Sequence, residues 1–147
     1  MNNRTVQQAN AWLKNTASPK KGRLNIDWEI HYVIDVSGIG GICNCHTHGM
    51  GKYNHLDFQI VFPAKSERLA VLLNTIGLMV QRGQRFEPGD YPMDNGVFTA
   101  PFRICKARET GRDVLRIILC DPNYRFPENP LCADPYKYQE ATGFFED

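Results

Sequence analysis

The sequence predicts an α+β domain, with a mostly antiparallel sheet and one long helix packed on one face. Two observations predict this class. Segments with strand patterns are grouped on both sides of a single segment with a strong helical pattern, residues 65–82. Glycine-containing turns separate several of these strand segments. No internal repeat is visible, and the length of 147 residues fits one domain.

The N-terminal segment predicts a short helix on a basic arm. Residues 1–26 carry five basic groups and no acidic group. Thr5 and Gln8 have the spacing of a capping box, and Pro19 requires the helix to end before it. We therefore divide the single domain, residues 1–147, into a basic helix and arm (1–23), an α+β core (24–121) and an irregular tail (122–147).

The first half of the core predicts two or three strands. Residues 28–36 alternate apolar and polar side chains, which is typical of a half-buried strand. A glycine-rich turn at residues 37–41 leads into a returning strand at residues 42–48. Strand character resumes at residues 57–62 and stops at Pro63.

Residues 65–82 predict the long helix, because their apolar side chains form a single stripe at helical spacing. Ser66 is the expected N-cap, and Gly83 is the expected glycine just past the C-terminus. The members of the stripe are Leu69, Leu72, Leu73, Ile76 and Val80.

Two more strands and an irregular tail are expected after the helix. Residues 97–108 have a strand pattern that Pro101 interrupts, which indicates an edge strand or a late start. Gly111 turns the chain into an apolar run at residues 114–120. The tail combines four prolines with aromatic residues, and we expect it to pack irregularly over the sheet and to offer a binding surface at Tyr124, Arg125 and Phe126.

Composition and charge exclude several classes of protein. With a net charge of +1 and 22% charged residues, the chain is neither a disordered polyelectrolyte nor a typical nucleic-acid binder. No run of about 18 apolar residues predicts a membrane span. The N-terminus lacks the apolar core of a secretory signal, and five cysteines, an odd number, favour a reducing compartment. We therefore expect a cytoplasmic protein.

One segment concentrates metal-binding residue types. In an extended strand, His46 and His48 share one face, and Cys43 and Cys45 share the other. The glycines at 49 and 51 let the chain turn, so that later side chains can approach the histidines. The expected ligands of a divalent transition metal such as zinc are His46, His48, His55 and Asp57. In the alternative interpretation, the histidines are only the polar face of a strand and the cysteines belong to the core.

Several segments in order resemble a bacterial family known as domain of unknown function 4262, over roughly residues 30–130. Residues 46–50 stand where that family has aromatic-Thr-x-Gly-Leu, and residues 55–58 stand where it has His-Pro-Glu-Leu. The helix with Leu72-Leu73-Asn74 follows, then Phe86-Glu87-Pro88-Gly89. Residues 121–127 resemble the closing Asp…Arg-Phe-Pro of the family.

The chain departs from the family at two places, where His46 replaces the aromatic residue and Leu56 replaces the proline. The resemblance implies a small bacterial protein and brings no established activity, cofactor or partner with it. We expect a non-enzymatic module that binds or antagonises another protein and requires no cofactor. The alternative is a small hydrolase that uses metal-bound water at the cluster of His46, His48 and His55. Neither the partner nor the oligomeric state follows from the sequence.

Overall fold

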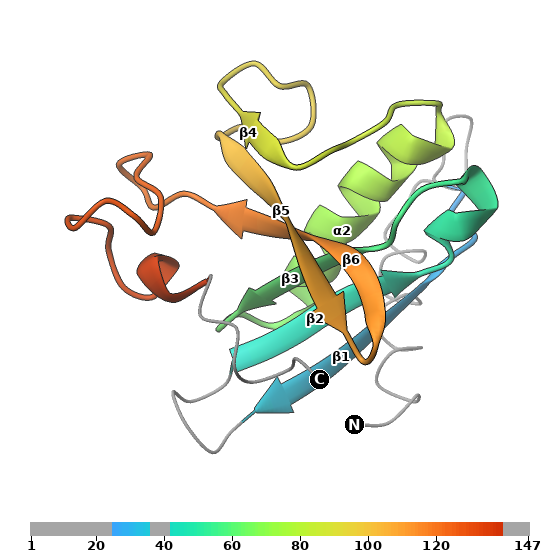
Figure 1. The fold of residues 1–147 in the computed structure, drawn as a ribbon, viewed down its shortest axis with the longest axis horizontal. Coiled ribbons are helices and arrows are strands. Elements are labelled where there is room, and N and C mark those ends of the chain that lie inside the picture. Colours follow the sequence, from blue (N-terminus) through green and yellow to red (C-terminus); the bar gives the residue numbers. More distant parts are fainter. Residues whose placement is uncertain (1–24, 36–41, 140–147) are drawn as a thin grey trace.

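The computed structural model describes residues 25–35 and 42–139, so the expected N-terminal helix and the turn at 37–41 lie outside the described residues. One six-stranded sheet and one α-helix form the described fold (Figure 1). The strands are β1 (Glu29–Asp35), β2 (Ile42–His48), β3 (Phe58–Phe62), β4 (Gly89–Tyr91), β5 (Phe102–Glu109) and β6 (Arg112–Leu119). The helix is α2 (Ser66–Gln81), and two short 3-10 helices, η1 (Met50–Tyr53) and η2 (Tyr136–Tyr138), complete the elements.

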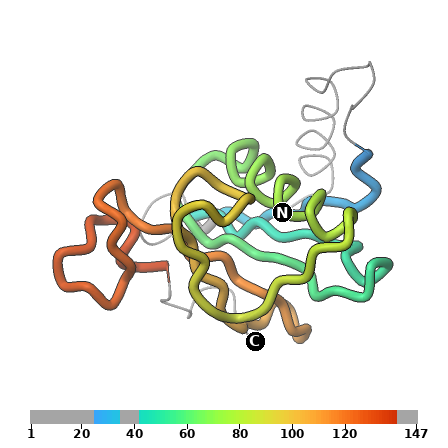
Figure 2. The backbone as a smooth tube through the Cα atoms, turned by 90° about the horizontal axis from the view of Figure 1, so that it is seen from above, coloured from blue at the N-terminus to red at the C-terminus, as the bar shows by residue number. Residues whose placement is uncertain are grey.

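The sheet is mixed and mostly antiparallel, with the strand order β1-β2-β3-β6-β5-β4. Strands β1 to β3 form one antiparallel meander, and β4 to β6 form a second one. The two meanders meet where β3 pairs in parallel with β6. The predicted α+β class is confirmed, with helix α2 covering one face of the sheet against β2 and β3 (Figure 2). The three-part division of the chain stays a prediction.

Helix α2 ends as its sequence predicts but begins differently. Gly83 has a φ of 105°, its N–H donates to Val80 O, and Gln84 N–H donates to Met79 O. These two bonds form a Schellman motif. At the N-terminus, the predicted cap was wrong: Lys65 is the N-cap, and its carbonyl oxygen accepts from the amides of residues 68 and 69, whereas Ser66 is the first helical residue.

The apolar face of α2 packs on the core through Leu69, Leu73, Ile76 and Val80, and Leu72 is only partly buried. Trp28 fixes the distance between the helix and the start of β1. Its Nε1 donates to Asn74 Oδ1 at 2.5 Å, and its ring lies against Gly77, where an added Cβ would come within 2.7 Å of Trp28 Cζ2.

The second meander contains a strand that the sequence does not predict. The short β4 pairs with the start of β5, and β5 itself begins directly after Pro101, in agreement with the predicted late start. Thr110 and Gly111 join β5 to β6 as a two-residue turn, with φ values of 48° and 79°. Positive φ at both positions is the geometry of tight hairpins.

After β6 the described chain, up to residue 139, contains turns and η2 but no strand, as expected for an irregular tail. The expected packing of the tail over the sheet is not what the structure shows, because the described part of the loop projects from the end of the sheet in both views (Figures 1 and 2). Asp121 organises it: the carboxylate accepts from the backbone amides of Asn123, Arg125 and Ala133. Within the described residues, no helix is long and apolar enough to cross a membrane.

Candidate metal centre

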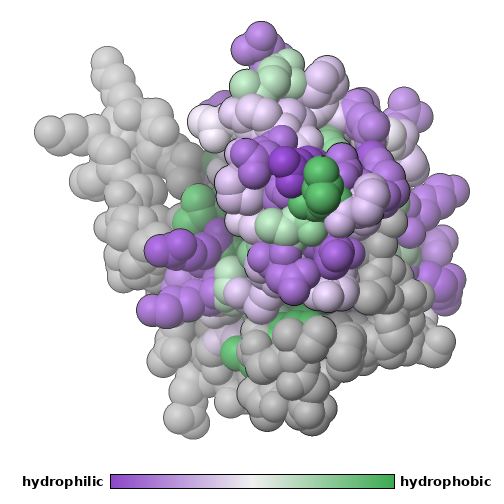
Figure 3. Space-filling view, turned by 90° about the vertical axis from the view of Figure 1, so that its left-hand side faces the viewer, coloured by the Kyte–Doolittle hydropathy of each residue, from purple (hydrophilic) through white to green (hydrophobic). Residues whose placement is uncertain are grey.

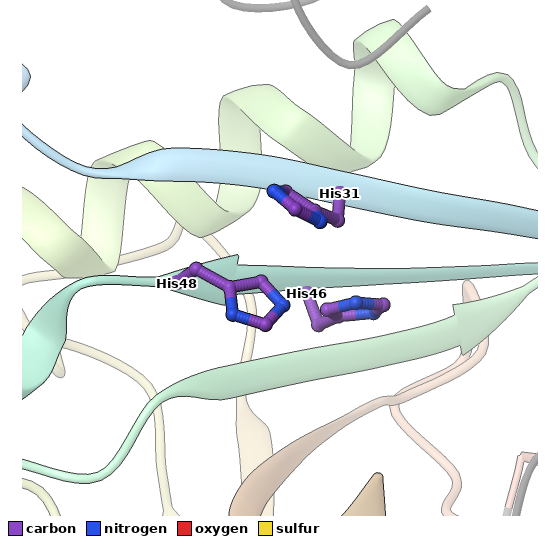
Figure 4. A group of neighbouring side chains, drawn as sticks. All are labelled: His31, His46 and His48. Carbon is purple, nitrogen blue, oxygen red and sulfur yellow. The ribbon is translucent and has the colours of Figure 1, made fainter. Parts of the chain in front are cut away.

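Three histidines converge on the face of the sheet opposite α2 (Figure 4). His46 and His48 project from β2, where the alternation of a strand places them on the same face. His31 projects from β1, because the antiparallel register pairs it directly with His46. We call His31, His46 and His48 the histidine triad. The core residues Cys43 and Cys45 lie on the helix-facing side of β2, as the sequence predicts.

The nitrogens of the histidine triad are close enough to serve one ion. Each ring offers one nitrogen, and these three atoms lie within 4.8 Å of one another. The ring centroids of His31 and His48 are 4.2 Å apart, and those of His46 and His48 are 5.1 Å apart. His46 is buried, whereas His31 and His48 are only partly buried. His46 is therefore held inside the fold, whereas solvent reaches the rings of His31 and His48.

Two members of the triad have one ring nitrogen fixed by an acceptor. His31 Nε2 donates to the Glu29 carboxylate at 2.8 Å, and this bond holds the pKa of Glu29 below its usual range. His46 Nδ1 lies 3.1 Å from Asn44 Oδ1. In a neutral imidazole, a donor at one nitrogen leaves a lone pair at the other. In the neutral rings, His31 Nδ1 and His46 Nε2 therefore carry the lone pairs that a cation would bind, as in many metal sites where a second partner orients the ligand. His46 Nε2 also lies 3.4 Å from the Glu109 carboxylate.

A chain of buried side chains determines which nitrogen of His46 carries the hydrogen. Arg116 Nε can only donate, and it donates to Gln59 Oε1 at 2.7 Å. The amide of Gln59 therefore presents its nitrogen to Asn44, and Gln59 Nε2 donates to Asn44 Oδ1 at 3.1 Å. Asn44 Oδ1 thus acts as the acceptor for His46 Nδ1–H, which leaves His46 Nε2 with its lone pair.

His48 has a different neighbour. Its Nε2 lies 3.3 Å from Arg112 Nη2, a contact in which the guanidinium donates. Arg112 has three stronger partners, at 2.7 Å from Asp57 Oδ2, 2.7 Å from Glu109 Oε1 and 2.8 Å from the carbonyl oxygen of Thr47. An ion bound at His48 Nε2 would replace only the longest contact, because the other three hold the guanidinium in place.

The electrostatic environment favours the neutral, ligand form of His46 and His48. Burial lowers the pKa of His46 to about 4, although the Glu109 carboxylate acts in the opposite direction. Burial, followed by the Arg112 guanidinium, also lowers the pKa of His48. Both imidazoles are therefore neutral at pH 7, and metal ions bind the neutral form.

The structure separates His55 from the histidine triad. Segment 50–53 forms η1, and His55 then turns toward the loop after α2, where its Nε2 accepts from the amide of Phe86 at 3.0 Å. Its Nδ1 donates to the carbonyl oxygen of Leu56 at 2.8 Å. Both ring nitrogens therefore have partners within the fold, and burial lowers the pKa of this imidazole as well.

Asp57 lies near the triad without joining it. Its Oδ1 accepts from the Thr47 hydroxyl at 2.7 Å and from the amides of Gly49 and Met50, and its Oδ2 pairs with Arg112. These bonds connect the end of β2, the start of η1 and the β5–β6 hairpin. The role of Asp57 in the structure is to position Arg112 and the turn after β2.

The expected binding residues Tyr124, Arg125 and Phe126 lie in the projecting loop. Tyr124 is 57% exposed, Arg125 donates to the carbonyl oxygen of Leu131, and the Arg103 guanidinium lies 4.4 Å from the centre of the Phe126 ring. The end of the molecule shown in Figure 3 is mainly hydrophilic, with a few hydrophobic residues between. A partner at this surface stays a prediction.

Comparison with known proteins gives no relative: no family model, no curated protein and no solved structure matches the chain. The resemblance to the bacterial family described above therefore stays a prediction. The proposed function therefore rests on the geometry of the site alone. Sequence reasoning missed His31. The signal that could have found it is the register between β1 and β2, which places position 31 opposite position 46.

Proposed function

We propose that the protein binds one divalent transition metal ion, of the zinc type, through His31, His46 and His48. The observation that carries this proposal is the convergence of three imidazole nitrogens, all within 4.8 Å of one another, from two adjacent strands. Imidazole is a common ligand of zinc, copper, iron and nickel, whereas magnesium and calcium prefer oxygen. The donor set therefore favours the first group of ions.

The site is near its bound geometry. Zn–N bonds of about 2.0–2.1 Å place the nitrogens of a tetrahedral ion roughly 3.3 Å apart. The nitrogens, now within 4.8 Å of one another, would have to approach further, and His31 and His48 are the two partly exposed rings that can rotate to do so. His46 provides the fixed point, because it is 3% exposed and bonded to Asn44.

Two functions were expected from the sequence, metal-dependent hydrolysis and the binding of a partner protein, and only the first requires a metal ion. Three imidazoles leave a coordination position that water can occupy, which is the requirement for a metal-dependent hydrolase. Hydrolysis stays a prediction, and so does the binding of a partner protein. Metal binding is the function that both the donor chemistry and the geometry of the described residues support.

The test is a zinc titration of protein purified without an affinity tag, followed by isothermal calorimetry and thermal unfolding. We expect one equivalent to bind and, at 100 times the dissociation constant, to stabilise the fold by about 2.7 kcal/mol. His31→Ala should abolish this effect without unfolding the protein, because His31 is partly exposed.

His55→Ala is the matched control, since it removes a histidine outside the triad that the sequence also predicts as a ligand. It should lower the unfolding temperature and leave the shift caused by zinc unchanged. Wild-type protein that shows no response to zinc, nickel or cobalt would refute the proposal. Loss of the response in His55→Ala but not in His31→Ala would replace the triad with the set predicted from sequence.

A further inference from the structure

The carboxylate of Glu109 lies beside His46, although Glu109 is not one of the three residues whose ligand atoms lie within 4.8 Å of one another. Glu109 Oε2 is 3.4 Å from His46 Nε2. The hydrogen-bond chain through Asn44 leaves that nitrogen with a lone pair, so two electron-rich atoms face each other. A positive charge between the two atoms, either a proton on His46 or a bound metal ion, would remove this repulsion. The separation matches the roughly 3.3 Å between two ligands of one tetrahedral zinc ion.

The β5–β6 hairpin holds this carboxylate in one direction. Arg112 Nε donates to Glu109 Oε1 at 2.7 Å, which occupies the oxygen that points away from His46. The Thr110 hydroxyl donates to Oε2 at 2.6 Å. A carboxylate oxygen has two lone pairs, so Oε2 keeps one for an ion. Glu109 is 6% exposed, and a buried carboxylate of this kind needs compensation from cations.

We infer that Glu109 is the fourth protein ligand, so that one ion is held by the histidine triad and this carboxylate. The inference rests on the proposed metal binding and goes beyond it in two respects. Four protein ligands close a tetrahedral site, and a closed site serves structure or sequestration rather than hydrolysis. The ion also links the β1–β2 pair to the tip of the β5–β6 hairpin, so that metal binding becomes coupled to the position of this hairpin.

The decisive experiment compares Glu109→Gln with Asp57→Asn. Both variants remove one negative charge from the surroundings of Arg112, but only the first removes the inferred ligand. We expect Glu109→Gln to weaken zinc binding by at least about tenfold in calorimetry. Asp57→Asn should leave the dissociation constant within about threefold, because Asn keeps an oxygen that can accept from Arg112 and Asp57 has no hydrogen bond to a triad imidazole. Equal losses in both variants would assign the effect to charge alone and overturn the inference.

Cobalt in the wild-type protein gives a second readout that does not depend on whether a variant folds. Four-coordinate Co²⁺ has intense visible absorption, and an open site changes its spectrum when azide is added. We expect a four-coordinate spectrum that azide leaves unchanged. A spectrum that responds to azide would show an open site and overturn the inference.

The two proposals fail in different ways. If wild-type protein binds no metal, the proposed function itself is wrong. If His31→Ala abolishes binding while Glu109→Gln binds zinc as tightly as the wild type, metal binding stands and Glu109 is not a ligand. Loss of binding in both His31→Ala and Glu109→Gln, with retention in Asp57→Asn, supports the four-ligand site.

Discussion

His31 and His46 lie directly opposite each other on strands β1 and β2, and their ring centroids are 6.0 Å apart. Residues paired in this way across an antiparallel ladder bring their side chains to the same face of the sheet. The pairing assembles the triad from positions 31, 46 and 48. A small change of register would separate the rings, because a slip by one residue moves a side chain to the other face.

The helix stripe makes a prediction about two adjacent leucines. Leu73 is fully buried, whereas Leu72 is only partly buried against the core. Leu73→Ala should therefore lower the free energy of unfolding by about 2–5 kcal/mol, and Leu72→Ala should lower it by about 1–2 kcal/mol. Urea denaturation monitored by circular dichroism measures both values. Equal losses of stability would show that Leu72 and Leu73 are equally buried, so that α2 would have to be rotated about its axis relative to this structure.

Gly77 should not tolerate even a methyl group. An added Cβ would lie 2.7 Å from Trp28 Cζ2, and the Trp28 ring is held by its bond to Asn74. Gly77→Ala gains about 1 kcal/mol of helix propensity, but the overpacking costs more, so we expect a net loss of about 1–2 kcal/mol.

Gly51→Ala is the control for this substitution, because its new Cβ would have no neighbour within 4 Å. It should change the free energy of unfolding by less than about 0.5 kcal/mol. Thermal unfolding of both variants decides the point: a Gly77→Ala protein as stable as the wild type would contradict the tight contact between Trp28 and α2.

The Arg103–Glu128 ion pair predicts a pH dependence of stability. Arg103 donates to both oxygens of Glu128, at 2.7 and 2.8 Å, and this pairing lowers the pKa of Glu128 to about 2. A lowered pKa in the folded state means that the pair stabilises the fold above the ordinary pKa of 4.5 and loses this effect as the pH falls toward 2.

Glu128→Gln should therefore lower the unfolding temperature at pH 6 and make little difference near pH 2. The carboxylate side chain is 64% exposed, so screening keeps the effect below about 1 kcal/mol. High salt at pH 6 should reduce it further. A difference between the two proteins that grows as the pH falls would contradict this account of the pair.

The five cysteines should all be thiols that differ in reactivity. None of them forms a disulfide in the structure, Cys43 and Cys45 are fully buried, and Cys105 is partly exposed. The neighbouring Cys43 and burial together raise the pKa of Cys45 well above its ordinary value, which makes its thiolate scarce. Alkylation followed by mass spectrometry should give five adducts after denaturation, with Cys43 and Cys45 modified last under native conditions. A reproducible intramolecular disulfide would contradict the prediction.

Local patterns in the sequence account for most of the fold. The alternation in residues 28–36 and the stripe in residues 65–82 reflect burial of one face, and burial is what shapes β1 and α2. Strand β4 has no such pattern, because its three residues are exposed or only partly buried. Strand β4 forms because it pairs with β5, and the local propensity of its residues does not predict this tertiary contact.

The candidate site was predictable only in part, because part of it depends on the pairing of two strands and not on a local pattern. His46 and His48 share a face because of the geometry of a single strand, and sequence alone predicts this. His31 joins them through the register between two strands. His55 was expected to return toward β2 after the glycines, but η1 carries the chain away, and the bond from Phe86 fixes the ring elsewhere.

The parallel pairing of β3 with β6 has a consequence for folding kinetics. Its register contains only two pairs, Phe58 with Leu115 and Gln59 with Arg116, and each pair joins residues 57 positions apart. The antiparallel meanders on either side close through much shorter separations along the chain, so they can form early. Closing this seam requires the ordering of a long loop, which is the slow type of step in sheet proteins. We therefore expect the seam to form after the two meanders, together with the bonds that cross it, from Arg112 to Asp57 and from Arg116 to Gln59.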